Sequence, residues 1–186
     1  MNKKILLIIA VLASAALTAR ANLVANPGFE SGDFTGWTQF GDTSFTDVQT
    51  FDVHSGTYAA EFGPTSTDGG ITQNITTVAG QGYDVSFWLD NRDTSGGSHM
   101  SASFAGVTLL TLPNGSPGFP YTFYSFTNII AASNSSALTF SFYNPPSWWD
   151  LDDVSVTPTV VPEPGTLGLI ALGALGLVGA VRKRLV

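Results

Sequence analysis

The chain of 186 residues contains no cysteine, which excludes a disulfide framework and a thiolate site. A folded domain must then be held by its core or by a metal ion. Basic residues are also scarce, because only Arg92 of the 7 Lys and Arg lies between Asn22 and Val160. Of the 14 Asp and Glu, all but Glu163 lie there, so this segment has 13 acids, 1 base and a net charge of −12. Such a segment repels nucleic acid and attracts divalent cations.

The motifs of common catalytic sites are absent as well. The 2 histidines, His54 and His99, have no partner motif, and there is no Gly-x-Ser-x-Gly, His-Glu-x-x-His or phosphate-binding loop. Asp90 and Asp93 would be an acid pair for glycoside cleavage, but they sit at a Gly/Ser-rich turn. We therefore expect a protein that is not an enzyme.

The N-terminal segment has the pattern of a secretory signal peptide. Lys3 and Lys4 precede an apolar run from Ile5 to Leu17, and Ala19-Arg20-Ala21 is a small-x-small cleavage site. The alternative is a membrane anchor, but a run of about 13 residues is too short to span comfortably. We predict a signal peptide over residues 1–21 and a mature chain that begins at Asn22.

The C-terminal segment has the pattern of a short membrane anchor. Residues 167–181 are all Leu, Ile, Ala, Val or Gly, and as a helix they would be about 22 Å long, against a hydrocarbon core of ~30 Å. The basic cluster Arg182, Lys183 and Arg184 would stop transfer and remain cytoplasmic. We predict a linker over 158–166, a transmembrane helix over 167–181 and a basic tail over 182–186.

Val161-Pro162-Glu163-Pro164, the Gly-rich apolar segment and the terminal basic cluster occur in this order. Together they resemble the PEP-CTERM sorting signal of exported proteins in Gram-negative bacteria that make extracellular polysaccharide. The resemblance implies export through the Sec translocon, retention in the inner membrane and processing by exosortase. The mature form would then act at the cell surface or outside the cell. An unprocessed tail anchor is the alternative.

The segment 22–157 shows strand periodicity and no helical period. Tyr83, Val85, Phe87 and Leu89 alternate with Asp84, Ser86, Trp88 and Asp90, which is typical of a strand with one buried face. Similar runs, split by turn residues, predict strands over 45–53, 57–62, 70–76, 100–104, 107–112, 121–130, 138–143 and 150–157. About eight to ten short strands favour an all-β, two-sheet sandwich.

Five ordered segments of this domain resemble carbohydrate-binding modules of the CBM4/9/22-like group. They are Asn22 to Glu30 with Gly36-Trp37, Val53 to Ala59, Gly70 to Ile75, Gly82 to Trp88 and Leu151 to Val156. The resemblance implies a jelly-roll β-sandwich with Trp37 in its core. It also implies a structural Ca²⁺ that ties the first strand to the last, with Glu30 and Asp152 as side-chain ligands and Asp153 as a lesser candidate. Backbone carbonyls of residues 54–56 would complete the shell, and solvated edge acids are the alternative.

Aromatic residues on polar strand faces are the candidate sugar platforms. Trp88 and Tyr143 alternate with polar residues, and we expect them to share one sheet face, aided by Asp84, Asp90 and Asn91. Trp148 and Trp149 follow Pro145-Pro146-Ser147 and would form a rim platform or cap the sandwich. The sequence thus predicts an exported, non-catalytic domain that binds polysaccharide. A structural or adhesive matrix protein that binds no sugar is the alternative.

Overall fold

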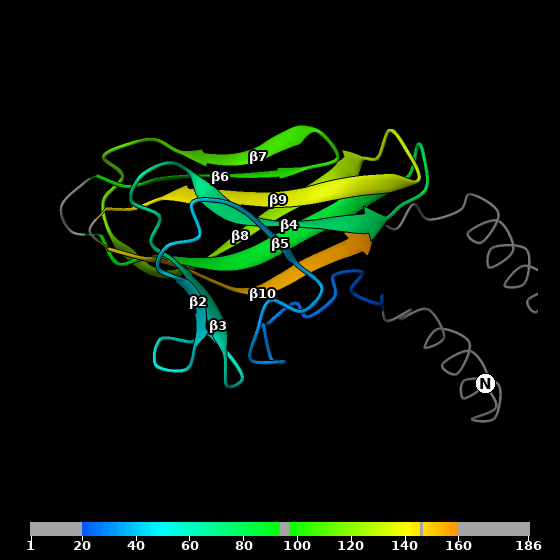
Figure 1. Ribbon diagram of the computed structural model, residues 1–186. Coiled ribbons are helices and arrows are strands. Elements are labelled where there is room, and N and C mark those ends of the chain that lie inside the picture. Colours follow the sequence, from blue (N-terminus) through cyan, green and yellow to red (C-terminus); the bar gives the residue numbers. More distant parts are fainter. Residues whose placement is uncertain (1–19, 94–96, 146, 160–186) are drawn as a thin grey trace, which may run out of the picture.

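The computed structural model describes residues 20–93, 97–145 and 147–159, which form a two-sheet jelly-roll β-sandwich (Figure 1). One antiparallel sheet has the strand order β1-β4-β9-β6-β7 and the other has the order β2-β3-β10-β5-β8. The strands are β1 (Thr38–Gly41), β2 (Thr46–Gln49), β3 (Ala59–Phe62), β4 (Gly69–Thr76), β5 (Gly82–Asn91), β6 (His99–Phe104), β7 (Val107–Leu112), β8 (Phe119–Ile130), β9 (Ser135–Tyr143) and β10 (Trp149–Pro158).

The core lies between the two sheets and follows the alternation in the sequence. In β5, Tyr83, Val85, Phe87 and Leu89 are buried, as predicted. Phe87 meets Phe140 of the opposite sheet edge to face, with ring centroids 5.0 Å apart. Among the described residues, the buried hydrophobic cluster lies between Val24 and Val156. Residues 22–159 therefore contain the core of the described sandwich.

The segment before β1 runs beside the last strand (Figure 1). Asn22 Oδ1 accepts the N–H of Val156 at 3.0 Å, and Asn22 Nδ2 donates to the Val154 carbonyl at 2.8 Å. Farther along, Val154 N donates to the Pro27 carbonyl at 2.9 Å. Trp37 is 7% exposed and packs against Phe29, which confirms its predicted place in the core.

Most of the predicted strands are confirmed, with two differences. The sequence analysis missed β1, which has only four residues and no buried alternation. The strand expected over 45–53 is shorter, because β2 ends at Gln49. Gln49 Oε1 accepts the N–H groups of Phe51 at 2.6 Å and Asp52 at 2.9 Å, and these bonds turn the chain out of the sheet.

Several predictions fall outside the described residues. These are the signal peptide up to residue 19, the Val161–Pro164 motif, the transmembrane helix over 167–181 and the basic cluster of Arg182, Lys183 and Arg184. Within the part of the chain that the structure describes, no helix has the length and apolar character needed to cross a membrane.

Candidate functional site

Of the predicted metal ligands, Asp152 and Asp153 bring their carboxylates beside Gly28, whereas Glu30 approaches Gly28 with its Cγ and directs its carboxylate toward residues 56–58. A Cβ atom added to Gly28 would lie 3.4 Å from Asp152 Oδ1, 3.6 Å from Asp153 Oδ1 and 3.8 Å from Glu30 Cγ. Asp152 Oδ1 accepts the N–H of Asp153 at 2.7 Å. Asp153 has a positive φ of 49° where the β10–β5 register shifts, and this irregularity turns its side chain toward the same place.

These carboxylates hold the loop that follows β2. Asp152 Oδ2 accepts the N–H groups of His54 and Ser55, both at 3.0 Å, and Glu30 Oε1 accepts the N–H of Thr57 at 2.9 Å. Asp152 is completely buried, and burial raises the pKa of its carboxyl to about 6 although these N–H groups act to lower it. An ionised Asp152 is therefore costly without further positive charge, and carboxylate oxygens are the ligands that Ca²⁺ takes.

His54 joins this cluster to Trp88. His54 Nδ1 lies 2.7 Å from Asp153 Oδ2, and His54, Asp152 and Asp153 each offer one ligand atom within 4.8 Å of the others. The imidazole also stacks on the indole of Trp88 with ring centroids 3.7 Å apart. The ring of Phe123 packs against the same indole, with ring centroids 5.3 Å apart. Trp88 is thus half-buried between protein side chains on the outer surface of its sheet.

Tyr143 lies on the other sheet, so the prediction that Trp88 and Tyr143 share a sheet face is wrong. Trp88 belongs to β5, whereas Tyr143 ends β9, and these strands occur in different sheets. Tyr143 is paired with His99 of β6, and their rings stack with centroids 5.0 Å apart. Ser101 and Ser141 are the next cross-strand pair on this face, so the aromatic pair is followed by hydroxyl groups.

Asp90 lies in a second acidic cluster beside Arg92, the only arginine between residues 22 and 159. Asp52, Asp90 and Asp150 offer carboxylate oxygens within 4.8 Å of one another. Arg92 Nε lies 2.7 Å from Asp150 Oδ2 in a close ion pair, although these two atoms are not aligned for a hydrogen bond. Arg92 Nη2 donates a hydrogen bond to Glu61. Burial raises the pKa of Asp150 to about 8 and that of Asp90 to about 6. Arg92 is therefore the internal counter-ion of this cluster.

Asp84 and Asn91 hold neighbouring segments of the chain in place. Asp84 Oδ1 accepts bonds from Thr159 Oγ1 at 2.6 Å and from the N–H of Asn128 at 3.0 Å, at the end of β5 opposite to Asp90. Asn91 is buried, and its Nδ2 donates to Ser98 Oγ at 3.1 Å. The structure therefore does not bring Asp84, Asp90 and Asn91 together with Trp88 as one polar platform.

The two adjacent tryptophans have different environments. Trp149 is completely buried and packs against Phe119 and Phe142, so the prediction that it contacts a ligand is wrong. The reason is that β10 begins at Trp149, and the strand directs this side chain into the core. Trp148 is half-buried just before the strand, and the Arg92 guanidinium lies 5.2 Å from its ring centroid.

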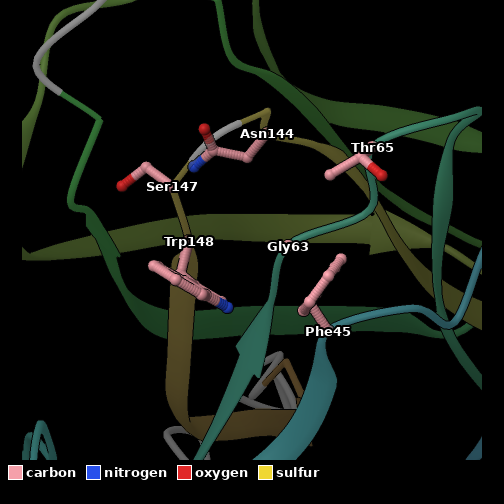
Figure 2. A pocket seen from close by; sticks show the side chains of 6 residues that line it. All are labelled: Phe45, Gly63, Thr65, Asn144, Ser147 and Trp148. Atoms are coloured by element: carbon pink, nitrogen blue, oxygen red, sulfur yellow. The ribbon is translucent and has the colours of Figure 1, made fainter.

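Trp148 and Phe45 lie on either side of a pocket at one end of the sandwich (Figure 2). The lining residues are Phe45, Gly63, Thr65, Asn144, Ser147 and Trp148, which precede or follow β2, β3, β9 and β10. A Cβ atom at Gly63 would approach Trp148 Nε1 to 2.9 Å, so the indole needs a glycine there. The hollow has a volume of about 150 Å³, comparable to a cavity that admits one benzene ring.

Two features of this end pocket are unusual in a folded protein. Asn144 is completely buried, and within the described residues neither its Nδ2 nor its Oδ1 has a hydrogen-bond partner. Phe45 is 63% exposed and has a positive φ of 56°, an unfavourable conformation for a bulky residue. Sequence reasoning found Trp148 but missed Phe45 and Asn144, because their meeting depends on the order of strands and not on any local pattern.

The C-terminal segment matches a family model described as the PEP-CTERM protein-sorting motif, over residues 160–184. The chain therefore carries a PEP-CTERM sorting signal, as the sequence predicted, and such a signal marks an exported protein that exosortase processes. No curated protein matches the chain.

Solved structures with the same fold include carbohydrate-binding modules. TmCBM61 in complex with β-1,4-galactotriose is 22% identical with a TM-score of 0.62, covering 75% of this chain and 99% of that one. The CBM22-1 xylan-binding domain of Paenibacillus barcinonensis Xyn10C is 15% identical with a TM-score of 0.56, covering 78% and 99%. The Stig cyclase Fisc from Fischerella sp. TAU is 14% identical with a TM-score of 0.54, covering 76% and 98%. At these identities the likeness establishes the fold alone.

Proposed function

We propose that this exported sandwich is a non-catalytic glycan-binding domain, and that the end pocket between Phe45 and Trp148 receives one sugar ring. The observation that carries the proposal is a ring-sized hollow with an aromatic side chain on either side (Figure 2). Sugar rings present apolar C–H faces to aromatic side chains, while a few polar groups fix their orientation. Tyr143 lies just before Asn144 on the other sheet and stacks on His99, and this pair would extend the contact along the glycan.

The polar recognition in this proposal comes from Thr65 and Ser147. Thr65 is exposed and Ser147 is half-buried at the pocket, so both residues are accessible to a ligand. A hydroxyl group can both donate and accept a hydrogen bond, which suits the hydroxyl groups of a sugar. The single-ring volume favours the end or a branch of a polysaccharide over the middle of a chain.

The test is affinity electrophoresis of residues 22–159 through gels that contain soluble polysaccharides, including β-1,4-galactan and xylan. We expect retardation by at least one polysaccharide, and we expect Trp148→Ala to weaken binding about tenfold or more. Trp88→Ala is the matched control, because Trp88 is also half-buried but already stacks on His54. Equal weakening by the two variants, or no retardation in any gel, would refute the pocket as the binding site.

We also propose that Ca²⁺ stabilises the sandwich at Asp152, Asp153 and Glu30. The proposal is supported by the carboxylates of Asp152 and Asp153, which lie close together beside Gly28 with Glu30 Cγ near them, and by the burial of Asp152. An ion that binds only the folded chain raises its stability. We expect millimolar Ca²⁺ to raise the melting temperature of the wild-type domain and to leave that of Asp152→Asn unchanged. An equal rise in both, or none in the wild type, would contradict the site.

A further inference from the structure

The charged residues of the domain lie in two parts of the chain, on either side of a long uncharged stretch. No Asp, Glu, Lys or Arg occurs from Thr94 to Trp149, a stretch that contains β6, β7, β8 and β9. The acids lie before this stretch or after it, on strands such as β2, β3, β5 and β10 and on the loops beside them. A domain with a net charge of −12 therefore has an uncharged part, where a second copy could approach without contact between like charges.

Strand β8 forms an edge within this uncharged part. It has twelve residues, Phe119–Ile130, and it lies at the end of the order β2-β3-β10-β5-β8, next to β5 alone. The edge strands β1 and β2 have four residues each, and β7 has six. The backbone N–H and C=O groups on the outer side of a long edge strand are a template for another strand.

The middle of β8 lacks the features that protect edge strands from pairing. Charged side chains are one such feature, and β8 has none. The pairing of β8 with β5 is irregular near Pro120 and near Asn128, which has a φ of 57°, but the run from Thr122 to Phe126 stays in register. Phe123 is 52% exposed in the middle of this run, so apolar surface is also available there.

We propose that β8 pairs in antiparallel fashion with β8 of a second copy, about a two-fold axis. The two five-stranded sheets β2-β3-β10-β5-β8 would then form one continuous sheet across both molecules. The charge distribution favours a second copy as the partner that pairs with β8. The β8 edge is uncharged, and a basic partner would bind the acidic strands instead. β2, at the opposite edge of the same sheet, carries Asp47 and would repel its own copy.

The proposal is tested by light scattering of residues 22–159, which contain the core of the described sandwich, over a range of protein concentrations. We expect the mass to double by about 100 μM protein and the dimer fraction to rise with salt, because salt screens the repulsion between the acidic strands. The double variant Ser125→Glu, Thr127→Glu places like charges at the seam, and we expect it to weaken dimerisation at least tenfold.

The matched control is Thr38→Glu, Gln39→Glu, which adds the same charge to two exposed residues of the β1 edge. We expect it to dimerise as the wild type does, and circular dichroism checks that both variants are folded. A wild-type domain that remains monomeric at every concentration and salt would overturn the proposal. Equal loss of the dimer in both double variants would overturn it too.

Discussion

Polar groups in the acidic part of this sandwich and in its uncharged part have different kinds of partner. Around β3, β5 and β10, four carboxylates surround Arg92, and Asp150 is completely buried. Across β4 and β9, neutral hydroxyl groups pair instead, as in the contact of Thr72 Oγ1 with Thr139 Oγ1 at 2.9 Å. The stability of the first part should therefore depend on pH and salt, and that of the second should not.

The end pocket lies where these two parts meet. Trp148 follows the uncharged strand β9, yet its ring also contacts the guanidinium of Arg92 in the acidic cluster. Phe51 lies 5.4 Å from the same guanidinium. The acidic cluster thus supports the Trp148 side of the pocket, which links the chemistry of the buried acids to the proposed glycan site.

The largest expected effect comes from removing the counter-ion. Arg92→Met leaves Asp150 and Asp90 buried without compensation, which should destabilise the domain by about 3–5 kcal/mol near pH 9, where Asp150 is ionised. Near pH 5 both acids can be protonated, so the loss should be much smaller. Urea denaturation at the two pH values measures the difference. Adding Asp150→Asn should restore part of the stability at high pH, and a loss that is equal at both pH values would contradict the role of Arg92.

A smaller effect is the pH dependence of the wild-type domain, measured in EDTA. The pKa values of Asp90 and Asp152 are raised from 3.8 to about 6, and that of Asp150 to about 8. Each folded acid holds its proton more tightly than the unfolded chain does. The stability it contributes is therefore complete below 3.8 and is lost as the pH rises through the folded pKa.

We consequently expect thermal unfolding of this domain to occur at lower temperature near pH 9 than near pH 5. Asp42 acts in the opposite direction, because hydrogen bonds from Ser66 and Ser44 lower its pKa, and its contribution is lost only in strong acid. A melting temperature that rises steadily from pH 5 to pH 9 would show that the buried acids are not held as the structure has them.

The smallest expected effect is a difference in stability between two variants, one with an acid added to the acidic part and one with an acid added to the uncharged part. Ser86 and Ser103 are both half-buried strand serines, but Ser86 lies between Asp84 and Asp90 on β5, whereas Ser103 lies on the uncharged β6. Ser86→Asp should cost about 0.5 kcal/mol more than Ser103→Asp at low salt, and the difference should vanish near 1 M salt. A difference that salt does not change would mean that packing, not charge, separates the two sites.

The strands of the sandwich could be predicted because their signal is local. Alternation in β5 depends only on neighbouring residues, and the structure buries Val85 and Phe87 as the pattern indicates. The adjacent pair Trp148 and Trp149 shows where this reasoning ends. Which indole enters the core depends on the residue at which β10 begins, and a shift of one position reverses the two sides of a strand.

The candidate site could be predicted only in part, because it depends on the order of strands in each sheet. Trp88 and Tyr143 have the same local pattern, yet β5 and β9 lie in different sheets. Phe45 and Trp148 are far apart in the sequence, and the jelly-roll connections bring them to the same end. The closeness of the Glu30 segment to Asp152 was predictable, because the resemblance to known modules includes both the first and the last segments, but the contact of the Glu30 carboxylate with residues 57 and 58 was not.

The central claim, a glycan bound between Phe45 and Trp148, can be tested directly by NMR of the indole N–H groups. The domain has four tryptophans, so each indole gives a separate reporter. Titration with the oligosaccharide of the best-bound polysaccharide should shift the Trp148 signal to saturation and leave those of Trp37 and Trp149 in place. A saturating shift at Trp88 with Trp148 unchanged, or no shift at any tryptophan, would contradict the account.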